Sequence, residues 1–219
     1  MDKNLAFFKA IKAGDTGKIK SLLKNKPELA HAVDEQGISA IMTAVYYGWQ
    51  PIIQVLVEHN KDLNIWEAAA TGQVETVKQT LETNESLLSA YSTDGFTPLS
   101  LAAFFGQKSV VEYLLTKGAK VNQAVSNATH VQPIHSAAAH HNPVVAMQML
   151  QVLLENGAQV DARQIGGWTA LHEAASRGDV EMVKLLKRYG ADISIKSDDG
   201  KTARELAIEK GHENILQLL

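Results

Sequence analysis

The chain has 219 residues, of which 45% are hydrophobic and 21% are charged, and it contains no cysteine. Its 24 acidic and 21 basic residues give a net charge of −3, so it lacks the basic surplus that nucleic-acid-binding proteins normally carry. Without cysteine, the chain cannot form disulfides, use a thiol in catalysis or hold zinc through cysteine ligands. We therefore expect a well-cored protein with no nucleic-acid partner.

The apolar residues are not distributed as in a membrane or exported protein. No apolar run approaches the roughly 20 residues that a membrane-spanning helix needs. Residues 1–9 have an acid at position 2 and an apolar stretch of four residues, shorter than the about 7–15 apolar residues of a signal peptide. These features predict a mature, cytoplasmic protein with no membrane partner.

A short segment bounded by two glycines recurs along the chain. It reads GISAIMTAVYYG at 37–48, GFTPLSLAAFFG at 95–106, GWTALHEAASRG at 167–178 and, degraded, GKTARELAIEKG at 200–211. A second apolar stretch follows each copy, and the clearest of these is VVEYLL at 110–115. The recurrence predicts a repeat protein built from pairs of short helices.

The chemistry of one copy explains the pattern. Gly95 permits the turn that enters the helix, Thr97 is placed as the N-cap, and Pro98 takes the first helical position. Gly106 ends the helix in a left-handed conformation. Each predicted helix has only about two turns and is too short to be stable alone in water, so neighbouring pairs must stack.

This pattern resembles the ankyrin repeat, most specifically over residues 93–122 and 166–193. The resemblance implies an all-α solenoid of stacked helix-turn-helix pairs with short β-hairpin loops. It covers nearly the whole chain, which we interpret as a single ankyrin repeat domain over 1–219. Seven units are expected, at about 4–36, 37–63, 64–94, 95–127, 128–162, 163–196 and 197–219.

The second and third units depart from the pattern. Four residues return 58 positions later, which indicates a duplicated block of two units: Gly14, Gly37, Gly48 and Asn64 recur as Gly72, Gly95, Gly106 and Asn122. From Gly48 to Gly72 there are only 24 positions, where a full repeat has about 33. We therefore expect the third unit to lack its hairpin, and Asn64 to lead almost directly into a helix.

The fifth unit departs in the other direction. From His135 to Gly157 there are 22 positions, against 18 over the matching stretch of the fourth unit. The four extra residues, near 142–148, amount either to one helical turn or to a loop bulge that begins at Pro143. His130 replaces the glycine of the hairpin.

The family resemblance places the function on exposed surfaces, because partners of ankyrin repeats usually contact the hairpin tips and the exposed face of the first helix. It implies a protein–protein interaction scaffold without a cofactor, which binds an unidentified protein partner, and a monomer is favoured. Six aromatic side chains in the matching positions could act as interface hot spots. The candidate partner-binding residues are Ile38, Tyr46, Tyr47, Phe96, Phe104, Phe105, Val131, His140, Trp168 and Arg177. The alternative is that neighbouring helices partly cover some of these rings.

A histidine group invites a metal-binding interpretation. His130, His135, His140 and His141 lie close together in the sequence, and imidazoles alone can hold zinc. Their spacing matches no zinc motif, and the resemblance implies that His135, like His172, fixes hairpin backbone instead. We therefore expect no metal site.

No arrangement of nucleophile, base and acid is visible in the sequence, and it contains no phosphate-binding loop. We expect no enzyme. Three alternatives to a general scaffold remain: a dedicated inhibitor or immunity-type protein that blocks one enzyme or toxin, a less favoured metal-binding or catalytic role at the group His130–His141, and self-association through the aromatic face.

Overall fold

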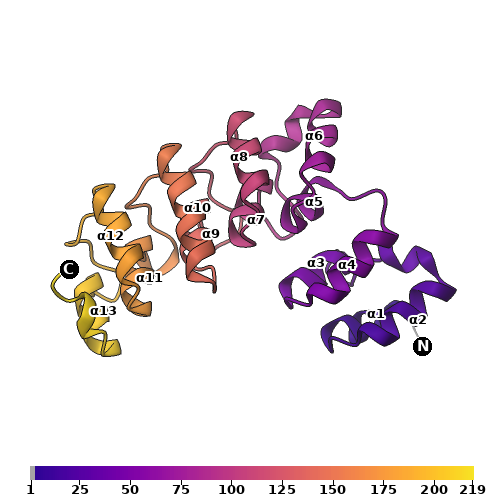
Figure 1. The fold of residues 1–219 in the computed structure, drawn as a ribbon, viewed down its shortest axis with the longest axis horizontal. Coiled ribbons are helices and arrows are strands. Elements are labelled where there is room, and N and C mark those ends of the chain that lie inside the picture. The colour runs from indigo at the N-terminus through magenta and orange to yellow at the C-terminus, as the bar shows by residue number, and fades with distance from the viewer. Residues whose placement is uncertain (1–2) are drawn as a thin grey trace.

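The computed structural model describes residues 3–219, which form an all-α array of helix pairs (Figure 1). Position 2, used above in the expectation about the N-terminus, lies outside these residues. The pairs follow one another along the long axis of the molecule, and the two ends of the array lie far apart. None of the helices in this part of the chain has both the length and the apolarity that crossing a membrane requires.

Six α-helix pairs and a shorter final pair make up the array. They are α1 (Lys3–Lys12) with α2 (Thr16–Asn25), α3 (Ala40–Tyr46) with α4 (Gln50–His59), α5 (Ile65–Thr71) with α6 (Val74–Thr83), α7 (Pro98–Phe104) with α8 (Lys108–Thr116), α9 (Pro133–Ala138) with α10 (Pro143–Glu155), α11 (Ala170–Arg177) with α12 (Val180–Arg188), and α13 (Ala203–Lys210) with the 3-10 helix η4 (Glu213–Ile215). Three further 3-10 helices are η1 (Pro27–His31), η2 (Glu85–Ser89) and η3 (Ile165–Gly167).

The helix ends form as the sequence predicts. The Thr97 side chain accepts a hydrogen bond from the Ser100 backbone N–H at the start of α7, and Pro98 occupies the first turn. Gly106, just beyond α7, has a φ of +70°, and a Cβ at this position would lie 2.3 Å from Val145 Cγ1. Glycine is therefore required there both for the left-handed backbone and for the space beside α10.

Five hairpin turns project from the same edge of the array, at residues 34–38, 92–96, 125–131, 164–168 and 197–201. In each turn the N–H of the first residue donates to the carbonyl of the last, at 2.8–2.9 Å. Backbone hydrogen bonds of 2.9 Å also join the last four turns to one another, for example from Ser126 N–H to Gly95 O. These turns form the predicted hairpin edge.

The structure confirms the duplicated block. Helix α6 repeats α2, η2 repeats η1, and α7 repeats α3, each at the offset found in the sequence and with an identical length. We call α1–α4 the first block and α5–α8 the second block. Within this correspondence α5 is the counterpart of α1, the first helix described.

The third unit lacks its hairpin turn, as predicted. Helix α4 ends at His59 and α5 begins at Ile65, so the five residues 60–64 are the whole connection. The Asn64 side chain accepts from Glu67 N–H, and the Glu67 carboxylate accepts from Asn64 N–H, so the connection leads straight into a capped helix.

The short connection coincides with a division of the hydrophobic core. An N-terminal core contains the buried residues of α1–α4 and η1 together with only Ala70 and Leu101 from the second block. A C-terminal core runs from Ile65 to Ile215. Helices α4 and α6 contact each other less than any other consecutive pair of second helices does, so the first block is joined mainly through α3 and α5.

The extra residues of the fifth unit form a helical turn, not a bulge. Helix α10 has 13 residues and α8 has nine, and the four additional residues continue the helix after Pro143. In the hairpin turn of this unit, His130 has a φ of +52° and is the one non-glycine residue among positions 3–219 with a left-handed backbone.

The divided core predicts that the two parts open independently. Ile41→Ala, in the N-terminal core, should destabilise by about 2–4 kcal/mol and speed hydrogen exchange in α1–α4 more than in α9–α12. Leu153→Ala, in the C-terminal core, should do the reverse, because stacked repeats transmit stability mainly to their neighbours. Mass-spectrometric hydrogen exchange checks both. A uniform rise along the chain in both variants would contradict the division.

Candidate functional site: an aromatic groove at the ends of four helices

A groove of about 480 Å³ opens where the C-terminal ends of α3, α5, α7 and α9 lie side by side. Five of the predicted partner-binding residues line it: Tyr46, Tyr47, Phe104, Phe105 and His140. The remaining lining residues are Val45, Gly48, Gln50, Ile53, Ala70, Thr71, Gln107, Ala139 and His141. No lysine, arginine, aspartate or glutamate is among them. The wall therefore consists of apolar and uncharged polar residues together with two histidines.

Small residues on α5 create the hollow. The second and fourth units place aromatic pairs in the two positions before the glycine that ends the first helix. At the same two positions the third unit has Ala70 and Thr71. Since these side chains fill little space, the aromatic pairs of the neighbouring units flank a recessed floor.

The aromatic side chains differ in how much surface they expose. Tyr47 is 50% exposed and Phe104 is 40% exposed, whereas Phe105 is half-buried. The Phe104 and Phe105 rings meet edge to face at 4.9 Å between centroids, and the Tyr46 ring lies 6.0 Å from that of Phe105. Tyr47 and Phe104 therefore both present exposed aromatic surface to a partner.

Tyr46 reaches across the third unit to the fourth. Its hydroxyl donates a hydrogen bond to the Asp94 carboxylate in the hairpin turn 92–96. Burial raises the pKa of Tyr46, and the bond to Asp94 and the negative charge of Asp94 raise it further. Tyr46 thus remains protonated, and its hydrogen bond to Asp94 links the two blocks. Even so, 41% of its surface is exposed.

The far wall of the groove carries a buried histidine, His140. Its ring stacks on His141 at 4.6 Å, and its Nδ1 accepts from Asn142 N–H at 3.1 Å. Burial lowers the pKa of His140, the hydrogen bond with the Asn142 backbone opposes this shift in part, and the charges of His141 and Arg177 add smaller lowering contributions. The Arg177 guanidinium donates to the carbonyls of Ala138 and His140, both at 2.9 Å, and so fixes the end of α9.

The other predicted residues lie outside the groove. Ile38, Phe96, Val131 and Trp168 share one position, the last residue of a hairpin turn, and all four are half-buried. Phe96 and Ile38 pack against the N-terminal core. The structure thus places these four residues along the hairpin edge, separate from the aromatic groove.

Sequence reasoning missed several groove residues. Ala70 and Thr71 could have been found by applying the two-before-glycine rule to the third unit as well as to the others. Gln107 carried no sequence signal. Its Nε2 donates to Ala70 O at 3.1 Å and to Phe105 O at 3.2 Å, which fixes the floor of the groove beside α7.

The buried histidines hold the hairpin edge in place. His135 Nδ1 accepts from Gln132 N–H at 3.0 Å, and its Nε2 bonds Ala162 O at 2.8 Å. His172 Nδ1 likewise accepts from Thr169 N–H, and its Nε2 bonds Lys201 O in the next hairpin turn. Because both nitrogens of each ring are engaged, neither ring has one left for a metal. In the described residues, no three histidine, aspartate or glutamate side chains are grouped as a metal ion would require.

The comparisons with known proteins agree with the fold. Residues 65–164 and 134–219 match the family model described as ankyrin repeats in three copies. An ankyrin repeat protein of Rickettsia felis is 32% identical over 197 residues, covering 74% of this chain and 84% of that protein. The ankyrin repeat protein nuc-2 of Neurospora crassa is 30% identical over 165 residues, covering 75% of this chain. The tyrosine-protein kinase HTK16 of Hydra vulgaris is 27% identical over 165 residues, which cover 74% of this chain. This chain spans 15% of nuc-2 and 21% of the kinase.

The histidine contacts predict how stability depends on pH. Burial lowers the pKa of His135 and of His172, so the unfolded chain binds their protons more readily than the folded chain does. The free energy of unfolding should therefore be constant above the unfolded histidine pKa of about 6.5 and fall below it, by up to about 1.4 kcal/mol per pH unit for each histidine.

Urea unfolding between about pH 7.5 and pH 5 measures this slope. The variant carrying His135→Gln and His172→Gln should show a clearly flatter slope, and His135→Gln alone should lie between the two. Equal slopes in the wild type, the single variant and the double variant would show that His135 and His172 do not cause the pH dependence.

Proposed function

The chain belongs to the ankyrin repeat family, and from that premise we propose that it is a scaffold whose protein partner binds in the aromatic groove at the ends of α3, α5, α7 and α9. Ankyrin repeats are generally protein–protein interaction modules. The observation that carries the proposal is the convergence of exposed aromatic rings on a hollow whose lining holds no acidic or permanently charged basic side chain.

The energetics of interfaces support this location. Interface energy is concentrated in a few aromatic or arginine side chains near the centre of the contact, surrounded by surface that excludes water. Tyr47 and Phe104 are exposed rings at the ends of the packed helices α3 and α7, so little conformational entropy is lost when a partner covers them. The groove would accept one or two apolar side chains of the partner, and the rest of the array offers enough area for an interface of about 800 Å² per partner.

The proposal involves binding without a chemical step. His135 and His172 are occupied by backbone contacts, and the Tyr46 hydroxyl is bound to Asp94. No feature of the groove favours a dedicated inhibitor of one enzyme or toxin over a scaffold. We therefore propose the general interaction role alone.

Affinity capture from source-cell lysate, followed by mass spectrometry, tests the site. The bait variant should carry Tyr47→Ala and Phe104→Ala, because these two side chains are exposed and, unlike Tyr46, form no hydrogen bond across the junction. A partner held by the wild type should be lost, since removing each hot spot costs about 2 kcal/mol or more.

The matched control is Tyr113→Ala on α8, which removes a half-buried ring that is not among the groove residues. It should retain the partner, and circular dichroism should show that both baits are folded. Equal capture by the groove variant and the wild type would overturn the proposed site.

A further inference from the structure

The loop between α9 and α10 is held differently from the matching loops of the second, fourth and sixth units. In these units a glycine with a φ of +66° to +71° follows the first helix, at Gly48, Gly106 and Gly178. The fifth unit has His141 at this position, and its backbone is not left-handed. Side-chain contacts must therefore fix the loop at residues 139–142, where α9 meets α10.

The residue before this glycine also changes along the array. It is Tyr47 in the second unit and Phe105 in the fourth. It is His140 in the fifth unit and Arg177 in the sixth. The first three of these side chains line the aromatic groove. His140 is thus the one ring of the three that can gain a positive charge, and a proton on it would charge the groove wall.

His140 supplies one of the contacts that hold the loop. Its Nδ1 accepts a hydrogen bond from Asn142 N–H at 3.1 Å. The Asn142 Oδ1 in turn accepts from Val144 N–H at 3.0 Å and from Val145 N–H at 3.3 Å, at the start of α10. The bond between His140 and Asn142 thus connects the end of α9 to the N-cap of α10.

Only a neutral His140 ring can make this bond. A protonated imidazole has a hydrogen on both nitrogens, so its Nδ1 cannot accept from Asn142 N–H. It can donate to the Asn142 carbonyl oxygen, 3.3 Å away, only after the Asn142 N–H has moved aside. The ring has little room to shift towards α7, because a Cβ on Gly106 would lie 3.2 Å from its Nε2. Protonation therefore forces the loop at Asn142 to rearrange.

The charges around His140 would repel an added proton. The His141 ring stacks on that of His140 at 4.6 Å between centroids and is a second imidazole that can become charged. On α11, the Arg177 guanidinium donates to the His140 carbonyl oxygen at 2.9 Å. Both groups act against protonation, and within residues 3–219 no carboxylate acts on His140 to oppose them.

The helices packed against α9 do not supply a counter-charge. Helix α7 contains no charged residue, and the single one of α10 is Glu155, its last residue. On α11, Glu173 lies one turn before Arg177 and interacts with that residue. His172, also on α11, is bound to the hairpin edge. A proton on His140 would therefore remain unpaired on the helix side of the groove wall.

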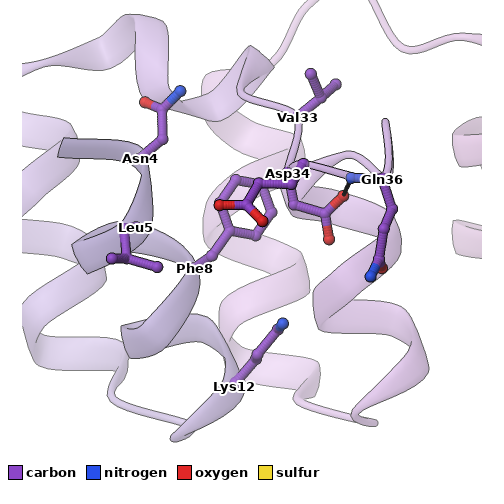
Figure 2. A pocket seen from close by; sticks show the side chains of 8 residues that line it. Asn4, Leu5, Phe8, Lys12, Val33, Asp34 and Gln36 are labelled. Carbon is purple, nitrogen blue, oxygen red and sulfur yellow. Dashed lines mark hydrogen bonds between the residues drawn. The ribbon is translucent and has the colours of Figure 1, made fainter. Parts of the chain in front are cut away.

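The lining of the groove does not supply a counter-charge either. It contains no aspartate or glutamate, and tyrosines are uncharged in acid, so Tyr46 and Tyr47 cannot balance a proton. The hollow of about 340 Å³ between α1 and the turn after η1 is different, because Lys12 and Asp34 both lie in its wall (Figure 2). A charge added there has a group of opposite sign nearby, whereas a charge on His140 is left to be solvated by water.

These contacts make the loop sensitive to pH. In the closed loop burial lowers the pKa of His140, and its hydrogen bond with the Asn142 backbone opposes this shift in part. In an opened loop the ring is in water, where an ordinary histidine has a pKa of about 6.5. Opening therefore takes up a proton below about pH 6.5 and is independent of pH above it.

We propose that protonation of His140 breaks its contact with Asn142 and opens the loop between α9 and α10, so that acid removes the far wall of the aromatic groove. The freed ring turns towards solvent and into the space that a partner would fill. Arg177 keeps its bond to the Ala138 carbonyl oxygen at 2.9 Å, so α9 stays in place and the change is confined to residues 139–145. The consequence for binding rests on the proposed function, whereas the opening is a property of the chain alone.

Hydrogen exchange on the full chain, measured by mass spectrometry and corrected for the intrinsic pH dependence of amide exchange, tests the opening. In the wild type, exchange over residues 139–145 should quicken between about pH 6.5 and pH 5, by up to about tenfold per pH unit, because each opening takes up one proton. Above about pH 6.5 it should stay constant. His140→Gln should show no such rise, since glutamine does not titrate.

Two further variants keep the test specific. His141→Gln should reduce the rise without abolishing it, because a proton on His140 then meets less repulsion in the closed loop. His59→Gln, at the exposed last residue of α4, is the matched control and should behave as the wild type does. Any contribution from His135 and His172 is present in all four proteins.

The proposal fails if residues 139–145 of the wild type keep their protection in acid, or if His140→Gln loses protection to the same extent. If His140→Gln opens the loop already at neutral pH, His141→Gln decides, and a rise equal to that of the wild type would overturn the proposal.

A partner captured at about pH 7.5 connects the opening to binding. Its capture by the wild type should fall by up to about tenfold at about pH 5.5, and its capture by His140→Gln should fall less. Equal falls would show that acid acts elsewhere and would overturn the regulatory role. Failure to capture any partner at neutral pH would count against the proposed function alone, because hydrogen exchange is measured on the unbound chain.

Discussion

The five-residue connection between α4 and α5 is the constraint from which the other features of the molecule follow. Each helix pair buries its apolar faces only against its neighbours, so the array must remain stacked even where a hairpin is missing. At this connection the stacking depends on the first helices. Ala70 and Leu101 enter the N-terminal core, Phe96 packs against it, and Tyr46 bonds Asp94 across the intervening unit.

The aromatic groove and this junction have a common origin. The unit without a hairpin also has small side chains at the end of its first helix, where its neighbours have aromatic pairs. Tyr46 can therefore extend over α5 towards Phe105 and the turn 92–96, and the space left beside it forms the groove. Tyr46, which links the two blocks, thus also forms one side of the groove. A partner that covers the groove would therefore contact Tyr46.

The sequence was sufficient where local chemistry decides structure. Spacing alone located the missing hairpin, because glycines with positive φ follow the first helices on both sides of it, at Gly48 and Gly72. The cap at Thr97, the short lead from Asn64 into a helix and the duplicated block also followed from local sequence signals. Spacing could not decide between a helical turn and a bulge after Pro143, since either accommodates four residues. In the structure the four residues form a helical turn, and α10 buries an apolar face on its neighbours.

The site was less predictable because it depends on contacts between distant residues. Tyr46 and Asp94 are 48 positions apart, and nothing in either repeat indicates that they pair. Ten residues, taken from hairpin tips and from the ends of first helices, were expected to share one surface. Five line the groove, whereas Trp168 and the others at the ends of hairpin turns lie along the edge, because the array separates hairpin tips from helix ends.

The central claim, that the Tyr46–Asp94 contact joins the two blocks across the missing hairpin, is tested most directly by a double-mutant cycle. Tyr46→Phe, Asp94→Ala and the combined variant are compared with the wild type by urea unfolding. A hydrogen bond to a charged group predicts that the two changes together cost less than the sum of the single changes, with a coupling energy of about 1–3 kcal/mol. Strictly additive losses would show that the two residues act independently and would contradict the account.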